Sequence, residues 1–216
     1  MKDKIRRTIG FILIIIGLSI IVSIAYKKIE TSKKQKELQN VLEELITGEG
    51  KVSDMTEEER LKFKDGYTPI ALIEIPSIKL YQGIIEGISD DVLLYYLGHF
   101  EGTAMPGEKG NFGVAGHRVS NYSDAFVNLY KAEIGDDIIV KANNKEYTYK
   151  ITESFIVEPS RVDVLENTKE ATITLVTCTV GAEERLIVKG ILVDTKELTK
   201  EGEQWVAFKK INISFL

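Results

Sequence analysis

The chain has 216 residues, of which 44% are hydrophobic and 28% charged, and its net charge is −5. This composition excludes a disordered or collagen-like chain and predicts one globular domain with appendages. Acidic residues outnumber basic ones beyond residue 46, which argues against a nucleic-acid partner, and the single cysteine excludes an internal disulfide.

The first predicted element is an apolar helix. Residues 8–26, TIGFILIIIGLSIIVSIAY, carry no charge and are long enough to cross a hydrocarbon core of ~30 Å. We therefore interpret residues 1–28 as a short N-terminal start and a transmembrane anchor. The alternative is a signal peptide, whose apolar core is usually only ~7 to 15 residues long, although Ser23 and Ala25 leave cleavage open. Basic residues flank both ends, so the positive-inside rule does not settle the orientation.

Residues 29–66 are predicted to form a juxtamembrane helix and a linker. The helix covers residues 29–46, where apolar side chains recur at helical spacing in a polar setting, namely Leu38, Val41, Leu42 and Leu45. The glycine-bearing stretch 47–54 follows as a break. Thr56 and Glu59 then form a capping box, which predicts a second, short helix.

From Tyr67 the chain changes to short runs rich in Ile, Val, Thr and Tyr, which predicts an all-β barrel or sandwich over residues 67–216. The seven candidate strands are IALIEIP, IKLYQGII, NFGVAG, DIIVKA, EYTYKITESFIV, ATITLVTCTV and RLIVKGILV. Two intervening stretches, near residues 90–98 and 124–132, have helical character.

One turn and one face can also be predicted within this domain. Asn143 and Asn144 lie between two candidate strands as a two-residue hairpin turn. Alternation in the second of these strands places Tyr147, Tyr149 and Ile151 on one face.

The only cysteine lies in TLVTCTVGAEERLIVKG, residues 174–190. If the two apolar runs pair as an antiparallel hairpin, Cys178 and Arg185 face each other with Cβ atoms ~4.5 to 5.5 Å apart. A guanidinium lowers the pKa of a neighbouring thiol and can hold an oxyanion. The pattern therefore indicates a nucleophile with its cation, while the competing interpretation is a small buried hydrophobic residue.

An acid or base for such chemistry must be one of two histidines. His117 follows the apolar run in GNFGVAGHRVS, where side chains reach solvent or a groove. His99 follows LLYYLG and is expected to hold a loop by hydrogen bonding. Residue pattern alone leaves open whether His117 is catalytic or structural.

The ordered motifs resemble those of sortases, the cysteine transpeptidases of Gram-positive cell envelopes. The resemblance runs from about residue 70 to residue 193 and rests on IEIPSIKLYQGIIEG, GHFEGTAMPGEKGN, GNFGVAGHR, TLVTC and RLIVKG. It implies a mainly β fold, a closed eight-stranded barrel with short helices behind an N-terminal transmembrane helix. It also implies a single-pass protein of the cell membrane whose catalytic domain is extracellular.

The resemblance further implies the roles of individual residues. Cys178 matches the nucleophile, His117 the catalytic histidine, Arg185 the catalytic arginine, and Thr177 a threonine that helps to bind substrate. The implied reaction cleaves an LPxTG-like sorting signal between Thr and Gly through a thioacyl-enzyme. The implied partners are secreted surface proteins with C-terminal signals of this kind and an amine acceptor, such as a peptidoglycan precursor.

Several alternatives remain at this point. The short segment 179–184 leaves no room for the helical insertion of class B, and the absence of an Asp-Pro-aromatic lid argues against a class C pilin polymerase, whereas class A and class D or E stay open. No cofactor is expected, since Glu158 alone is too little for a calcium site. A membrane-tethered, non-catalytic barrel that binds peptides or acts as a sensor is the other candidate, and it predicts an inert Cys178.

Overall fold

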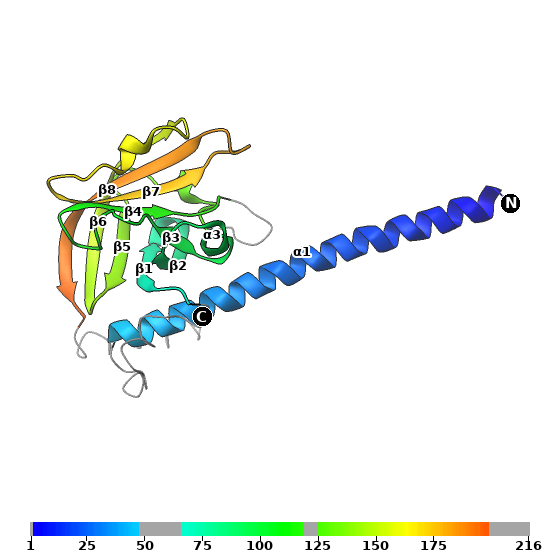
Figure 1. The fold of residues 1–216 in the computed structure, drawn as a ribbon, viewed down its shortest axis with the longest axis horizontal. Helices are drawn as coiled ribbons and strands as arrows, with labels where there is room; N and C mark the ends of the chain where they lie inside the picture. The colour runs from blue at the N-terminus through cyan, green and yellow to red at the C-terminus, as the bar shows by residue number, and fades with distance from the viewer. Residues whose placement is uncertain (1, 48–65, 119–124, 199–216) are drawn as a thin grey trace.

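The computed structural model describes residues 2–47, 66–118 and 125–198 (Figure 1). A long helix, α1 (Lys2–Thr47), extends from a barrel of eight strands. The strands are β1 (Pro69–Ile75), β2 (Leu80–Glu86), β3 (Leu97–His99), β4 (Gly110–Ala115), β5 (Asp137–Ala142), β6 (Lys145–Val157), β7 (Ala171–Cys178) and β8 (Arg185–Glu197). The shorter helical elements are α3 (Asp90–Tyr95), η2 (Pro76–Ile78), η3 (Leu129–Lys131) and η4 (Val162–Leu165).

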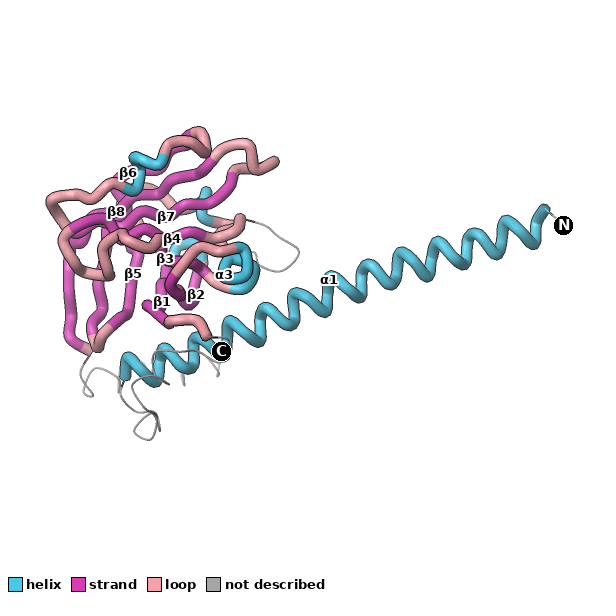
Figure 2. The backbone as a smooth tube through the Cα atoms, viewed as in Figure 1, coloured by secondary structure: helices cyan, strands magenta, loops and turns pink. Residues whose placement is uncertain are grey.

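The strands close on themselves in the order β1-β2-β3-β4-β7-β8-β6-β5. Neighbours are antiparallel except for β2 with β3 and β4 with β7, which are parallel. The predicted closed eight-stranded barrel is confirmed, and Figure 2 shows the strands grouped together with the C-terminal part of α1 running along one side of them. The seven predicted strands are present, and β3 is the strand that the pattern missed, because three residues around a central glycine are too short to show alternation.

Local predictions within the barrel also hold. Asn143 and Asn144 both have left-handed φ values, 52° and 58°, as a type I′ turn between β5 and β6 requires. Tyr147, Tyr149 and Ile151 are all buried. Helix α3 begins at Ser89, whose hydroxyl accepts from the Val92 amide, whereas the second predicted helical stretch is only the 3-10 turn η3 within its described part.

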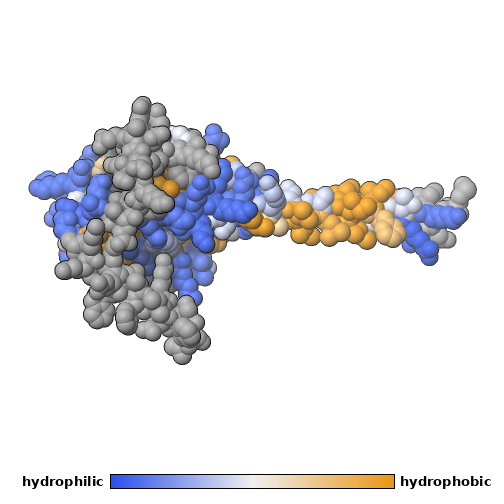
Figure 3. Space-filling view, turned by 90° about the horizontal axis from the view of Figure 1, so that it is seen from below, coloured by the Kyte–Doolittle hydropathy of each residue, from blue (hydrophilic) through white to orange (hydrophobic). Residues whose placement is uncertain are grey.

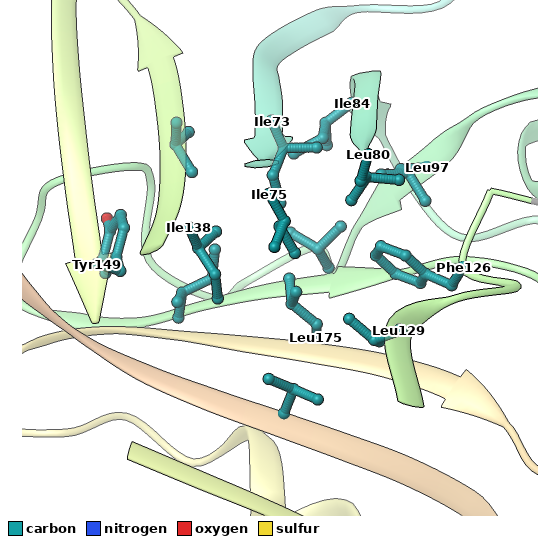
Figure 4. Close-up of a cluster of buried hydrophobic side chains, with 14 of the residues drawn as sticks. Ile73, Ile75, Leu80, Ile84, Leu97, Phe126, Leu129, Ile138, Tyr149 and Leu175 are labelled. Atoms are coloured by element: carbon teal, nitrogen blue, oxygen red, sulfur yellow. The ribbon is translucent and has the colours of Figure 1, made fainter. Parts of the chain in front are cut away.

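Side chains from every wall of the barrel fill its interior (Figure 4). Ile73 of β1, Ile138 of β5, Leu175 of β7 and Tyr149 of β6 meet there, and Phe126 and neighbouring residues close one end. Because inward and outward residues alternate along each strand, this packing fixes which side chains remain on the outside. The outside of β4, β7 and β8 carries the residues considered below.

Helix α1 joins the predicted anchor and the predicted juxtamembrane helix into one element. Its N-terminal half carries a band of exposed apolar side chains (Figure 3). Among the described residues, it is the one helix long and apolar enough to cross a membrane. The helix predicted from the Thr56 and Glu59 capping box lies outside the described residues.

Candidate active site

The ends of β4 and β7 bring His117 and Cys178 together. The two strands run parallel with Ala115 opposite Val176, and the Gly116 amide extends the ladder by donating to the Val176 carbonyl at 3.1 Å. Continuing this register one residue past Gly116 sets His117 level with Cys178, and paired strands are ~4.8 Å apart. A separation of 61 positions in the sequence is therefore closed by one parallel strand pair.

Both side chains belong to the outer face of the barrel. On β7, Ile173 and Leu175 point into the core, as Phe112 and Val114 do on β4. Alternation then directs Cys178 outward, where its side chain is half-buried. His117 has the same parity as the outward residues of β4 and is also half-buried.

The hairpin between β7 and β8 places Arg185 directly opposite Cys178. The antiparallel register pairs Cys178 with Arg185 and Thr177 with Leu186, which confirms the predicted register. The Thr179 amide donates to the Glu184 carbonyl at 3.0 Å, and the Glu184 amide donates to the Thr179 hydroxyl at 3.2 Å. These bonds close the loop tightly and hold the thiol and the guanidinium on one face.

The guanidinium of Arg185 is anchored by its own loop. Nη1 donates to the carbonyls of Ala182 and Glu184 at 3.1 and 3.2 Å. A guanidinium has five N–H donors, so these two contacts leave others for an acyl oxygen or a peptide carbonyl. On its other side Arg185 pairs with Val157, the last residue of β6. The residue is thus fixed by strands on both flanks.

Thr177, predicted to bind substrate, points the other way. Its side chain is 2% exposed, and its hydroxyl donates to the Gly116 carbonyl at 2.8 Å. This bond links the C-terminal end of β7 to Gly116, the residue before His117. The side chain therefore couples the two strand ends from inside the barrel, and only the Thr177 backbone lies at the outer face.

Asn111, which the sequence pattern did not single out, shapes the same outer face. Asn111 of β4 is fully buried; its Nδ2 donates to the Val164 carbonyl at 3.2 Å, and its Oδ1 accepts from the Thr174 hydroxyl at 2.8 Å. These bonds fasten η4 across β4 and β7 on the side of the face remote from Cys178. An asparagine at an outward position of an otherwise apolar strand was the available signal.

His99 has the structural role expected of it. Nδ1 lies 3.0 and 3.1 Å from the carboxylate oxygens of Glu86, and Nε2 lies 2.9 Å from the Thr103 hydroxyl and 3.2 Å from the Ala104 carbonyl. The ring also packs against Phe112, with 5.2 Å between ring centroids. His99 thereby holds the loop after β3 onto the barrel.

No metal site is evident in the described part of the chain, since His, Cys, Asp and Glu side chains do not gather there in groups of three or more. Glu158 is exposed at the end of β6. Nearby, Arg161 forms two hydrogen bonds of 2.7 Å to Asp163, and this pairing lowers the pKa of the Asp163 carboxyl. That carboxylate is satisfied by a cation of the protein itself.

A thiol at a strand end of a closed barrel, with a guanidinium across the ladder, is an arrangement suited to acyl transfer through a thioester. Residues 73–193, more than half of the chain, match the family model of the sortase domain. The chain therefore belongs to the sortase family.

Known sortases share both sequence and fold with this chain. Sortase A of Listeria monocytogenes is 32% identical over 62% of this chain and 61% of its own length. Sortase SrtE1 of Streptomyces coelicolor is 36% identical over 60% of this chain and 42% of its own length. The chain thus spans less than two thirds of these two relatives. A Clostridium perfringens Sortase D5 transpeptidase structure is 38% identical, with a TM-score of 0.58 over 72% of this chain and 99% of that one.

Proposed function

We propose that this protein is a membrane-anchored sortase that cleaves an LPxTG-like sorting signal between Thr and Gly and transfers the protein to an amine. The observation that carries the proposal is the pairing of Cys178 with Arg185 on the outer face of the barrel, at the strand end beside His117. Family membership supplies the class of reaction.

Each of the three side chains has a defined task in this proposal. The Cys178 thiolate attacks the threonine carbonyl carbon, and the bond from that carbon to the glycine nitrogen breaks as His117 gives its proton to the leaving amine. An incoming amine then loses a proton to His117, attacks the thioester and releases the thiolate. Arg185 stabilises the oxyanion in both steps. Thr177 maintains the spacing of the two strand ends through its bond to Gly116.

The placement of the chain follows from the same proposal. Residues 1–28 form the cytoplasmic start and a single membrane span, residues 29–66 the juxtamembrane helix and linker, and residues 67–216 the catalytic domain outside the cell. The exposed apolar band of α1 supports the span, and the lone thiol fits a catalytic role in an exported domain. The substrates are secreted surface proteins that end in a sorting signal, and the acceptor is a peptidoglycan precursor or another cell-wall amine.

Intact-mass spectrometry tests the proposal directly. The detergent-solubilised full chain is incubated with a panel of LPxTG-type peptides, with and without an amine. We expect a thioacyl adduct on the parent protein, its loss when the amine is added, and no adduct on Cys178→Ala. If no peptide of the panel forms an adduct or a transfer product, the transpeptidase proposal fails and a non-catalytic peptide-binding barrel takes its place.

A further inference from the structure

Beyond its apolar band, α1 presents a buried stripe to the barrel. Thr31, Gln35, Leu38 and Leu42 are 6%, 6%, 0% and 3% exposed. Their spacing of four, three and four residues keeps them on one side of a helix. A stalk that only separates the barrel from a membrane would have no such stripe, so this part of α1 is a docked element of the fold.

The apolar half of the contact is a small core of its own. Leu38 and Leu42 pack with Leu72 of β1, Ile85 of β2, and Val92 and Tyr96 of the α3 segment. Gly83 of β2 leaves room for these two leucines, because a Cβ at this position would lie 2.4 Å from Leu38 Cδ2 and 3.2 Å from Leu42 Cδ1. The close approach of helix and barrel therefore depends on glycine at this position.

Polar contacts fix the direction of the docked helix. The Gln39 amide nitrogen donates to the Tyr81 carbonyl at 2.9 Å, the Tyr81 hydroxyl donates to a Glu43 carboxylate oxygen at 2.6 Å, and Gln35 donates to the Tyr95 carbonyl. Burial, and next the hydrogen bond to Glu43, raises the pKa of the Tyr81 hydroxyl. Such directional bonds specify one orientation of α1 on the barrel, which apolar packing alone does less well.

The docked part and the apolar part belong to one uninterrupted helix. Residues 18–47 contain neither glycine nor proline, the usual causes of a kink. Thr31, the first docked residue, lies only five positions after Tyr26, the last residue of the uncharged stretch. At 1.5 Å per residue this is ~8 Å, so the barrel is held close to the end of the apolar segment.

The candidate active site lies on the side of the barrel that faces this segment. In Figure 1, β4 and β7 end, and β8 begins, on the side from which the N-terminal half of α1 extends. We infer that α1 acts as a rigid strut that turns the Cys178 end of the barrel toward the membrane surface, so that the enzyme acts on peptides and amines that are themselves held at that surface. This inference rests on the proposed function for its substrates and on α1 being the anchor.

The orientation can be measured without any enzymatic reaction. Cys178 is the only thiol of the chain, so a maleimide donor fluorophore labels one position. The labelled full chain is placed in vesicles with acceptor-labelled lipid headgroups, and time-resolved energy transfer reports the distance from donor to surface. We expect a narrow distribution of short donor lifetimes for the parent.

Two insertions after Lys28 test separately the rigidity of α1 and the distance between the barrel and the membrane surface. About eight Gly and Ser residues break the helix while both the apolar segment and the docked stripe persist, and we expect a broad lifetime distribution. About seven alanines, two helical turns, raise the barrel by ~10 Å and keep the strut, so that the distribution shifts and stays narrow. Equal distributions for the parent and the Gly-Ser variant would overturn the inference.

Activity supplies the second readout. Transfer is compared for a soluble peptide with a soluble amine, and for the same pair carried on lipid anchors in the vesicle. Two variants are compared with the parent: the Gly-Ser insertion, and Gly83→Leu, which displaces Leu38. In each, the rate of transfer between the anchored partners should fall about fivefold or more, while the rate with the soluble pair should change little. Unchanged transfer between anchored partners in both variants would contradict the strut. If the parent fails with soluble substrates, the proposed function falls, and the lifetimes still decide the orientation.

Discussion

The two histidines of the chain occupy opposite environments. His99 is 2% exposed, and both of its ring nitrogens have partners within 3.2 Å. His117 is half-buried at the end of β4, where its carbonyl accepts from the Phe126 amide at 3.0 Å. Its ring forms no hydrogen bond with any other residue of the ranges 2–47, 66–118 and 125–198.

In the proposed mechanism, this difference separates the structural use of His99 from the chemical use of His117. A ring whose two nitrogens are both engaged, with a carboxylate on one side, has no free position from which to deliver a proton to a substrate. The proposed mechanism assigns this proton transfer to His117. The neighbouring residues already suggested that His99 holds a loop, and the contacts of its ring name the partners, Glu86, Thr103 and Ala104.

The sharpest test of the comparison is to remove each ring in turn. His117→Gln is expected to lower turnover about a thousandfold, because the leaving amine and the incoming amine lose their proton carrier. The protein should unfold at the same temperature as the parent. Steady-state transpeptidation and thermal denaturation measure the two quantities, and a His117→Gln protein with near-parental turnover would remove this histidine from the mechanism.

Removing the guanidinium opposite Cys178 should lower turnover almost as much as removing the His117 ring. Arg185→Ala is expected to reduce kcat about a hundredfold, since the oxyanion loses its charged donor, with a smaller change in KM. Arg185→Lys keeps the charge and loses the planar fork, so a partial recovery is expected. Kinetics with one sorting-signal peptide measure both variants; turnover of Arg185→Ala at the parental rate would show that the pairing is only structural.

Replacing the buried His99 should lower the stability of the protein and leave its turnover nearly unchanged. His99→Ala leaves the Glu86 carboxylate and the loop carbonyl without their partner, at a cost of about 1 to 3 kcal/mol in the free energy of unfolding. In a domain of this size that corresponds to a midpoint lower by about 5 °C. Glu86→Gln, which keeps one hydrogen bond, should cost less. Turnover measured well below the midpoint should stay within about twofold of the parent, and a large loss there would give His99 a chemical role.

The smallest effect on the free energy of unfolding is expected from the bond that couples the two strand ends. Thr177→Val removes the hydroxyl that donates to Gly116, which should destabilise the fold by about 1 kcal/mol and lower turnover severalfold. Thr177→Ser retains the donor and is the matched control. Denaturant titration and kinetics give the two numbers. If serine and valine behave alike, the Thr177 hydroxyl does not set the spacing of His117 and Cys178.

Much of the barrel could be predicted because its signals are local. Seven strands, the Asn143-Asn144 turn and the buried face of β6 follow from alternation and turn chemistry over a few residues. The facing of Cys178 and Arg185 also follows from a short loop between two apolar runs, since a hairpin leaves few registers. Strand β3 could not be predicted, because three residues carry too little pattern.

By itself, then, the sequence determined the class of fold, the long apolar segment and the thiol-guanidinium hairpin, all of which depend on near neighbours along the chain. Tertiary structure alone decided the rest. The parallel pairing of β4 with β7 brings together the strand ends that lead to His117 and Cys178, Glu86 bonds to His99 from another strand, and Leu38 packs against Gly83. Each of these contacts joins segments that are distant in sequence, and closing the barrel is what makes them neighbours, since no local periodicity encodes which strands or helices will meet.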